Sequence, residues 1–278
     1  MAAPPEIQNM ALFCDFENVA LGVHEANYPR FDIAKVLERL LLKGNIVVKK
    51  AYCDWERYKD FKKVMHEAAF ELIEIPHVRQ SGKNSADIRM VVDALDLCYT
   101  KSHVDAFVII SGDSDFSPLV SKLRENNKVV IGVGVRKSTS DLLTANCDEF
   151  IFYDDLVQAQ EQKKRRAAKK AEGVVASGKS AAKPSKPASA EDARRQEATQ
   201  LLIETVEALV AERGEENKLW ASMVKQALKR RRPDFSESAY GFSSFRELLE
   251  TARASGLLAV DRDEKSGNYL LRLVHRDD

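Results

Sequence analysis

Short apolar segments alternate with amphipathic stretches along the first 158 residues, and this alternation constrains the fold more than any other feature. Each apolar segment is long enough for one strand, and the stretches between them have the spacing of apolar residues that a helix requires. A repeated strand–helix–strand pattern predicts an α/β domain in three layers, with a mainly parallel sheet between helices. The predicted strands cover residues 10–16, 45–53, 71–76, 106–112, 128–135 and 149–154.

The rest of the chain divides into a linker and a second, smaller domain. Residues 159–195 begin with a run of lysine and arginine and continue in Ala, Ser, Lys, Gly and Pro, which is typical of a flexible linker. Residues 196–276 contain three helical patterns and then two strand patterns around Lys-Ser-Gly-Asn, which predicts a β-hairpin. Three helices and a terminal hairpin indicate a winged helix, so we expect an α/β domain over 8–158 and a winged helix over 196–276.

These parts differ in charge, although 43 basic and 43 acidic residues cancel over the whole chain. Residues 1–160 hold 19 basic and 24 acidic residues, whereas residues 161–190 hold nine basic and two acidic ones. The basic linker is therefore either a solvated tether or a nucleic-acid contact. We expect a cytoplasmic protein, because the sequence shows no membrane-spanning apolar run, no secretory leader pattern and only scattered cysteines.

Acidic side chains follow two of the predicted strands at the point where each strand ends. Asp15 follows the first strand in "CDFEN", and Asp113 and Asp115 follow the fourth in "SGDSD". In the strand order 3-2-1-4-5 these two strands are neighbours, and the carboxylates meet at the edge where α/β sheets bind ligands. Carboxylates that close raise one another's pKa unless a cation lies between them. Because oxygen ligands suit a hard divalent ion, the sequence predicts a Mg²⁺ or Mn²⁺ site.

The helical pattern "SADIRMVVDALDLCY" offers a further acid. Asp87 lies in its first turn at the edge of the predicted buried stripe, whereas Asp93 points away from that stripe and is expected to be solvated. Asp96 lies on the other flank of the stripe, and its role is left open. We therefore predict Asp87, not Asp93, as a metal ligand. The predicted stripe consists of Ile88, Val91, Val92, Leu95 and Tyr99.

Each of these residues also has a purely structural interpretation. Asp87 is a favourable charge at a helix N-terminus, and Asp115 can cap the helix that follows it. Asn18 and Ser111, which we predict to support the acids, are common turn residues. Only the convergence of four acids on one sheet edge indicates a functional site.

Other phosphate and metal sites do not match the sequence. It contains no GxxxxGK[ST] loop, and "GVGV" at 132–135 lacks the third glycine of a dinucleotide-binding motif. The five histidines form no HExxH pair. A haloacid-type phosphatase needs DxD on the first strand, where this chain has Asp15, Phe16 and Glu17.

Three segments in order, "LFCDFENV", "KNSADIRMVVDAL" and "VIISGDSDFSPLV", resemble the NYN domain, a LabA-like branch of the PIN-like nuclease superfamily. The resemblance covers about residues 8–156 and implies a parallel sheet with an acidic, metal-binding pocket that cuts RNA. The acids of the family fall on Asp15, Asp87, Asp113 and Asp115, which the resemblance makes catalytic residues and metal ligands.

Residues 197–274 resemble the LOTUS domain, also called OST-HTH, most clearly in "PDFSESAYGFSSFRELLE". This resemblance implies binding of RNA or, in some members, of protein. We expect the aromatic residues of the segment in the core and not as stacking platforms for bases. These residues are Phe235, Tyr240, Phe242 and Phe245.

An acidic pocket repels an anionic phosphodiester, so a metal ion and basic side chains have to attract RNA. The candidate RNA-binding residues are Lys83, Arg89 and Lys137 in the first domain and Arg230, Arg231 and Arg232 at a helix end in the second. Such side chains are more often plain surface charges. We predict a divalent-metal-dependent ribonuclease with an RNA-binding winged helix; the alternative is a non-catalytic RNA-binding or scaffolding regulator.

Overall fold

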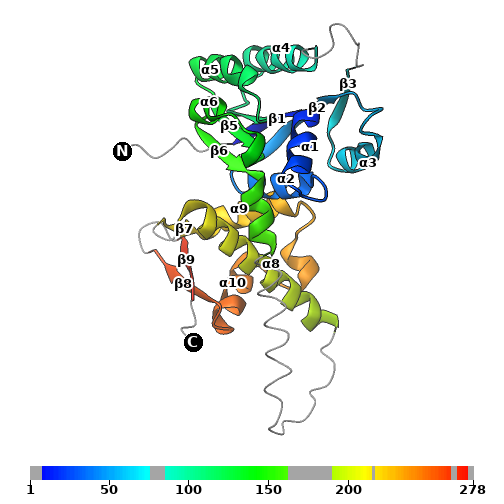
Figure 1. The fold of residues 1–278 in the computed structure, drawn as a ribbon. Helices are drawn as coiled ribbons and strands as arrows, with labels where there is room; N and C mark the ends of the chain where they lie inside the picture. The colour runs from blue at the N-terminus through cyan, green and yellow to red at the C-terminus, as the bar shows by residue number, and fades with distance from the viewer. Residues whose placement is uncertain (1–7, 76–84, 162–189, 215–216, 264–267, 275–278) are drawn as a thin grey trace. The chain divides into compact units, whose positions relative to one another are not determined.

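The structure, a computed structural model, describes residues 8–75, 85–161, 190–214, 217–263 and 268–274. It divides into two units, residues 1–178 and 179–278 (Figure 1). None of the helices in the described ranges is both long and apolar enough to cross a lipid bilayer.

A six-stranded parallel sheet forms the centre of the first unit, in the order β3-β2-β1-β4-β5-β6. The predicted order 3-2-1-4-5 is confirmed, and β6 adds an edge strand beside β5. The strands are β1 (Asn9–Asp15), β2 (Asn45–Cys53), β3 (Glu71–Glu74), β4 (Ala106–Ile110), β5 (Val129–Gly134) and β6 (Glu149–Phe152).

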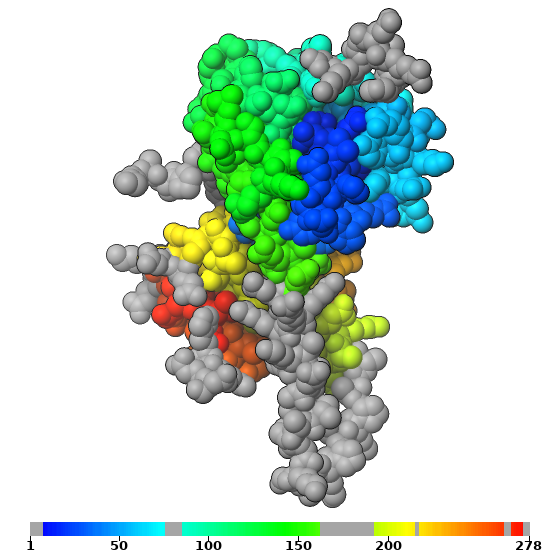
Figure 2. Space-filling model, in the orientation of Figure 1, coloured from blue at the N-terminus to red at the C-terminus, as the bar shows by residue number. Residues whose placement is uncertain are grey.

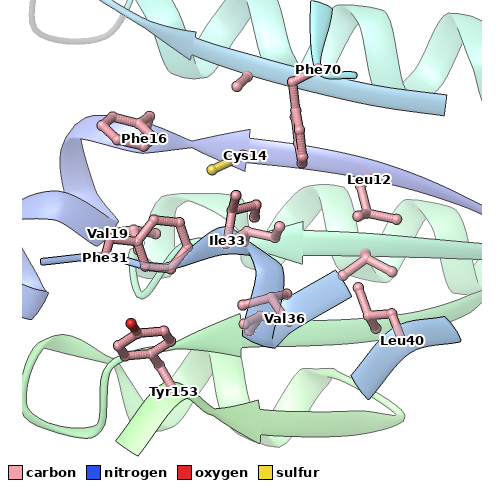
Figure 3. Packing of buried hydrophobic residues seen from close by; sticks show 14 of the residues in the cluster. Leu12, Cys14, Phe16, Val19, Phe31, Ile33, Val36, Leu40, Phe70 and Tyr153 are labelled. Carbon is pink, nitrogen blue, oxygen red and sulfur yellow. The ribbon is translucent and has the colours of Figure 1, made fainter. Parts of the chain in front are cut away.

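Helices cover both faces of this sheet, because successive side chains of each strand point to opposite faces. Leu12 and Cys14 of β1 belong to the core on one face (Figure 3), and Phe13 belongs to the core on the other. The first face packs against α1 (Phe16–Glu25), α2 (Ile33–Leu41), α3 (Lys59–Glu67) and the helical residues 153–161. The second face packs against α4 (Ser85–Thr100), α5 (Ser117–Glu125) and α6 (Asp141–Asn146). The three-layer fold is therefore confirmed.

The segment after β5 lies against the segments that follow β1 and β4. Its short 3₁₀ helix η3 (Arg136–Ser138) contacts α1, and in Figure 2 the dark-blue surface of α1 borders the green surface of the later residues. A Cβ atom on Gly22 would lie 2.2 Å from Ser138 Oγ, and one on Gly112 would lie 2.4 Å from the Ser138 carbonyl oxygen. Glycine is therefore required at Gly112 for this close approach of two backbones.

The buried face of α4 differs from the predicted stripe. Ile88, Val92 and Tyr99 are exposed by 62%, 56% and 64% of their surface. The buried residues of α4 follow one another at a spacing of four and include two with small side chains, which let the helix approach the sheet closely. They are Met90, Ala94 and Cys98. Of the predicted stripe, Val91 and Leu95 are partly buried and pack against the same core.

Asp93, predicted to be solvated, is turned toward the sheet. Its side chain is only 12% exposed and pairs with Lys50 at 3.4 Å and with Arg89 at 3.1 Å. It also accepts a 2.9 Å hydrogen bond from the hydroxyl of Tyr52 on β2. The prediction was wrong because it considered apolar residues alone, whereas the buried tyrosine hydroxyl requires a polar partner.

The second unit is a winged helix with a small antiparallel sheet in the order β7-β9-β8. The elements are α8 (Ala190–Arg213), β7 (Leu219–Trp220), α9 (Ala221–Arg231), the 3₁₀ helix η4 (Glu237–Tyr240), α10 (Phe245–Ala254), β8 (Leu258–Arg262) and β9 (Tyr269–Leu273). The sequence did not predict β7, and α8 begins inside the segment predicted as linker.

The aromatic residues of the second unit lie where the sequence placed them. Phe235, Phe242 and Phe245 are buried, and the ring of Tyr240 stacks on Phe235 with 5.3 Å between centroids. These side chains stabilise the core of the unit and offer no exposed row of rings to bases.

Candidate functional site

The candidate site lies at the carboxyl edge of the sheet, where β1 and β4 end side by side. The two strands pair in parallel, with Cys14 opposite Ile110. Asp15, the last residue of β1, and Ser111, the residue after β4, are therefore separated by about the 4.8 Å spacing of neighbouring strands.

Ser111 links the acids of the two strands. Its side chain is fully buried, and its Oγ donates a 3.0 Å hydrogen bond to Asp15 Oδ2. The same oxygen accepts a 3.2 Å hydrogen bond from the backbone N–H of Asp113. One hydroxyl group thus fixes the Asp15 carboxylate and the backbone of Asp113 relative to each other.

Asn18 makes a second link between the same two loops. Its backbone N–H donates to Asp15 Oδ1 at 3.4 Å, so Asp15 caps the N-terminus of α1. Its side-chain Oδ1 accepts a 2.8 Å hydrogen bond from the N–H of Gly112. The two residues predicted as supporting, Asn18 and Ser111, are therefore both adjacent to Asp15.

Asp113 and Asp115 lie at the start of the short 3₁₀ helix η2 (Ser114–Phe116). Asp113 Oδ1 accepts a 3.0 Å hydrogen bond from the N–H of Asp115 and caps η2. Asp113 is partly exposed and Asp115 is exposed. Their carboxylates therefore lie on the solvent side of the buried Asp15.

The acids act on one another electrostatically. Burial, and then the negative charges of Asp87 and Asp113, raise the pKa of Asp15 to about 7, although hydrogen bonds from Ser111 and Asn18 oppose the change. Burial, and then Asp113, Asp115 and Glu17, raise the pKa of Asp87 to about 6. Asp87 of α4 is thus brought to the same edge as the strand-end acids.

This set of donors fits a hard divalent cation in its chemistry. It consists of carboxylate oxygens whose mutual repulsion a positive charge would relieve. Within the described part of the chain, however, no three His, Cys, Asp or Glu side chains stand close enough together to hold a metal ion. The acids are gathered at one edge without forming a closed set of ligands.

Sequence reasoning missed a pair of charged residues beside the acids. Arg57 Nη1 lies 2.8 Å from Glu17 Oε1, and Glu17 is one of the charges that raise the pKa of Asp87. Arg57 follows β2 in "CDWER", and β2 ends at the same edge as β1. Its place after a strand end was the signal that could have identified it.

The candidate RNA-binding residues of the first unit are less well placed. Lys83 lies outside the described residues. Arg89 pairs with Asp93. Lys137 Nζ donates to the carbonyl oxygen of Glu25 at 3.1 Å, at the C-terminal end of α1, and the length of that ten-residue helix separates it from Asp15 by about 15 Å.

The three arginines at the end of α9 differ in their surroundings. Arg231 Nη1 donates a 3.2 Å hydrogen bond to Thr205 Oγ1, and Thr205 is buried on α8. Arg232 is exposed and Arg230 is half-buried. Arg231 therefore has a structural role, whereas Arg232 and the exposed Lys229 present charge to solvent.

Comparisons with known proteins identify the families of the two domains. The family model of the NYN domain matches residues 9–154. The chain belongs to the NYN domain family. A second model, the OST-HTH/LOTUS domain, matches residues 193–267. The NYN domain therefore carries the acidic edge, and the LOTUS domain is the winged helix.

Two known proteins are similar to part of this chain. Uncharacterized protein MJ0482 of Methanocaldococcus jannaschii is 26% identical over 132 residues, which are 48% of this chain and 52% of that protein, so the chain spans about half the length of this curated relative. The crystal structure of a protein of unknown function, VPA0982 from Vibrio parahaemolyticus, shows 26% identity and a TM-score of 0.48, and the match covers 56% of this chain and 98% of that one.

Membership of these families indicates a general class of activity. NYN domains are typically ribonucleases of the PIN-like class, and OST-HTH/LOTUS domains bind RNA. The NYN match includes all four predicted acids, and the LOTUS match includes the arginines at the end of α9.

Proposed function

We propose that the chain is a divalent-metal-dependent ribonuclease that hydrolyses RNA phosphodiester bonds. The observation that supports this most is the coupling of four carboxylates at one edge of the NYN sheet. Burial, and then the negative charge of the neighbouring acids, raises the pKa of Asp15 to about 7 and that of Asp87 to about 6, and carboxylates perturbed in this way cluster at functional sites.

Asp15, Asp87, Asp113 and Asp115 are the proposed metal ligands and catalytic residues. A divalent ion bound there, Mg²⁺ or Mn²⁺, supplies positive charge to the phosphate as its transition state gains negative charge. Ser111 and Asn18 hold the carboxylate of Asp15 in place through hydrogen bonds to its two oxygens.

Basic side chains around the acids attract the substrate in this proposal. The guanidinium group of Arg57 is half-exposed beside Glu17 and can contact an RNA phosphate. Lys83, Arg89 and Lys137 remain candidates for contacts farther along the strand. In the LOTUS domain, Arg232 with Arg230 contributes phosphate contacts at the end of α9, while Arg231 supports that helix end.

We also propose a cytoplasmic location, because the four cysteines are free thiols, as expected in a reducing compartment.

One observation favours the alternative, a non-catalytic RNA-binding or scaffolding protein. In the described residues the carboxylates do not form a closed set of metal ligands. A metal-binding nuclease requires these side chains to draw together when the ion binds, whereas a binding protein does not.

A matched pair of variants on α4 tests the nuclease. Asp87 and Asp96 lie on the same helix, but Asp96 is exposed and away from the acidic edge. Full-length protein with Asp87→Asn should lose cleavage of a labelled single-stranded RNA in Mn²⁺ by at least about 100-fold, while Asp96→Asn should cleave like the wild type. Equal rates for the two variants would exclude Asp87 from the site.

A further inference from the structure

A groove opens beside the acidic edge, between the start of α5 and α6. Its volume is about 470 Å³, within the range of small-ligand pockets. Its lining consists of Ser114, Asp115, Ser117, Pro118, Ser121 and Leu142. Because Asp115 also belongs to the candidate metal site and raises the pKa of Asp87, the groove adjoins the acids directly.

The charge of the lining decides which part of a nucleic acid fits. Among the described residues that line the groove, the charged one is Asp115, and it is negative. A phosphate group would be repelled there, whereas the uncharged sugar and base of a nucleotide would not. Three serine hydroxyls offer hydrogen bonds to a sugar or a base edge, and Pro118 and Leu142 offer apolar surface to the face of a base.

A bound ligand would lower the free energy of two side chains in the lining, Ser117 and Leu142. Ser117 is 6% exposed, and its buried Oγ has no hydrogen-bond partner among the described residues. Rotation of this side chain toward the groove therefore breaks no hydrogen bond, and a ligand hydroxyl there would satisfy it. Leu142 is 58% exposed, which leaves most of an apolar side chain in water. Ser121 Oγ, in contrast, already donates to the carbonyl of Ser117 at 3.1 Å.

We propose that this groove is a nucleoside subsite, which holds the ribose and base of a nucleotide next to the scissile phosphate, with Ser117 contacting the ribose 2′-hydroxyl. The proposal rests on the proposed ribonuclease function and adds to it a basis for choosing RNA over DNA, since the 2′-hydroxyl is the group that distinguishes the two.

Photo-crosslinking locates the nucleotide without requiring cleavage. Full-length protein is irradiated in EDTA with single-stranded RNA that carries 4-thiouridine, and the crosslinked peptides are mapped by mass spectrometry. Crosslinks are expected within residues 114–121 or at Leu142. Ser121→Tyr, at an exposed position, fills the groove and should reduce them at least fivefold, whereas Ser102→Tyr, at an exposed turn beyond α4, should not. Wild-type crosslinks that avoid these residues, or that are unchanged in Ser121→Tyr, overturn the subsite.

Discrimination between sugars tests the role of Ser117. The rate of cleavage in Mn²⁺ is compared for an RNA and for the same RNA with one 2′-deoxy residue at the cleavage site. Ser117→Ala should reduce the preference for the ribonucleotide about threefold to tenfold, the value of one hydrogen bond, with Ser102→Ala as the matched control. If the preference for the ribonucleotide is unchanged in Ser117→Ala, Ser117 does not contact the 2′-hydroxyl.

The two experiments separate failure of the subsite from failure of the nuclease. If the wild type cleaves no RNA in Mn²⁺ or Mg²⁺, the proposed function is wrong, and the crosslinks still decide whether the groove holds a nucleotide. If the wild type cleaves RNA but the crosslinks avoid the groove, the nuclease stands and the subsite is wrong.

Discussion

The hydroxyl of Ser111 donates a 3.0 Å hydrogen bond to Asp15 Oδ2, from a residue that follows β4 to one that ends β1. The two residues are 96 positions apart in the sequence, and only the parallel pairing of the two strands brings them together. This contact fixes the orientation of the Asp15 carboxylate. We therefore predict that substitutions at Asp15 change both stability and activity.

The first prediction concerns pH and stability in the absence of metal. Because the pKa of Asp15 is raised to about 7 in the folded protein, the folded state holds this proton more tightly than the unfolded state. Its favourable contribution is complete below about pH 4 and is lost as the pH rises to about 7. In EDTA at pH 8, Asp15→Asn should therefore be more stable than the wild type, by on the order of 2–3 kcal/mol, and the difference should disappear toward pH 4.

Urea denaturation at several pH values measures this difference, with Asp96→Asn as a control that should follow the wild type. An Asp15→Asn protein that is less stable than the wild type at pH 8 would show that the cap of α1 and the bond to Ser111 outweigh the cost of burying the charge and the repulsion from the neighbouring acids.

The second prediction concerns metal binding. A divalent ion that binds only the folded protein raises its melting temperature, and a concentration of 100 times the Kd corresponds to about 2.7 kcal/mol. For a unit of this size we expect a rise of about 5–10 °C in the melting of the NYN domain with Mn²⁺. Asp113→Asn should remove most of the rise and Asp96→Asn should retain it, as measured by scanning calorimetry. A rise of equal size in both variants would place the ion elsewhere.

The third prediction concerns Gly112, which lies between Ser111 and Asp113. A Cβ on Gly112 would lie 2.4 Å from a backbone oxygen of Ser138, and the carbonyl of Gly112 accepts a 2.9 Å hydrogen bond from Ser140. The two segments cannot separate without loss of that bond. Gly112→Ala should therefore destabilise the NYN domain by ~1–3 kcal/mol in urea denaturation. If Gly112→Ala is as stable as the wild type, the backbone around Ser138 can move away from the added Cβ without loss of stability.

The fourth prediction separates charge from structure at the end of α9. A protein with both Lys229→Ala and Arg232→Ala should bind RNA more weakly, with a salt slope shallower by about one to two units, and should melt like the wild type. Arg231→Ala should destabilise the LOTUS domain by ~1 kcal/mol, because it removes the hydrogen bond to the buried Thr205. RNA affinity that is unchanged in the double variant would exclude Lys229 and Arg232 from the contact with RNA.

The strands of the sheet could be predicted because each buried strand appears in the sequence as a run of apolar residues. The order of the first five strands was predicted from the alternating pattern together with the requirement that Asp15 and Asp113 share an edge, and the structure has that order. The short strand β7 could not be predicted, since two residues, Leu219 and Trp220, carry no period, and only their pairing with β9 defines them as a strand.

The orientation of α4 was predicted wrongly for a physical reason. The larger apolar residues, such as Ile88 and Tyr99, suggested one face, but Ala94 and Cys98 allow closer packing on the sheet. Asp87 nevertheless interacts with the strand-end acids, because its place in the first turn and not its angle to the stripe brings it to the edge. Partners from other elements, such as Tyr52 for Asp93, are not visible in local periodicity.

Cleavage of RNA in the presence and absence of metal tests the central claim most directly. Full-length protein is incubated with end-labelled single-stranded RNA in Mn²⁺, in Mg²⁺ and in EDTA, beside Asp15→Asn and Asp113→Asn proteins that remain folded. The proposed function predicts cleavage by the wild type in one of the metals, none in EDTA, and a loss of at least about 100-fold in each variant. Cleavage that persists in EDTA, or full activity of Asp113→Asn, would contradict it.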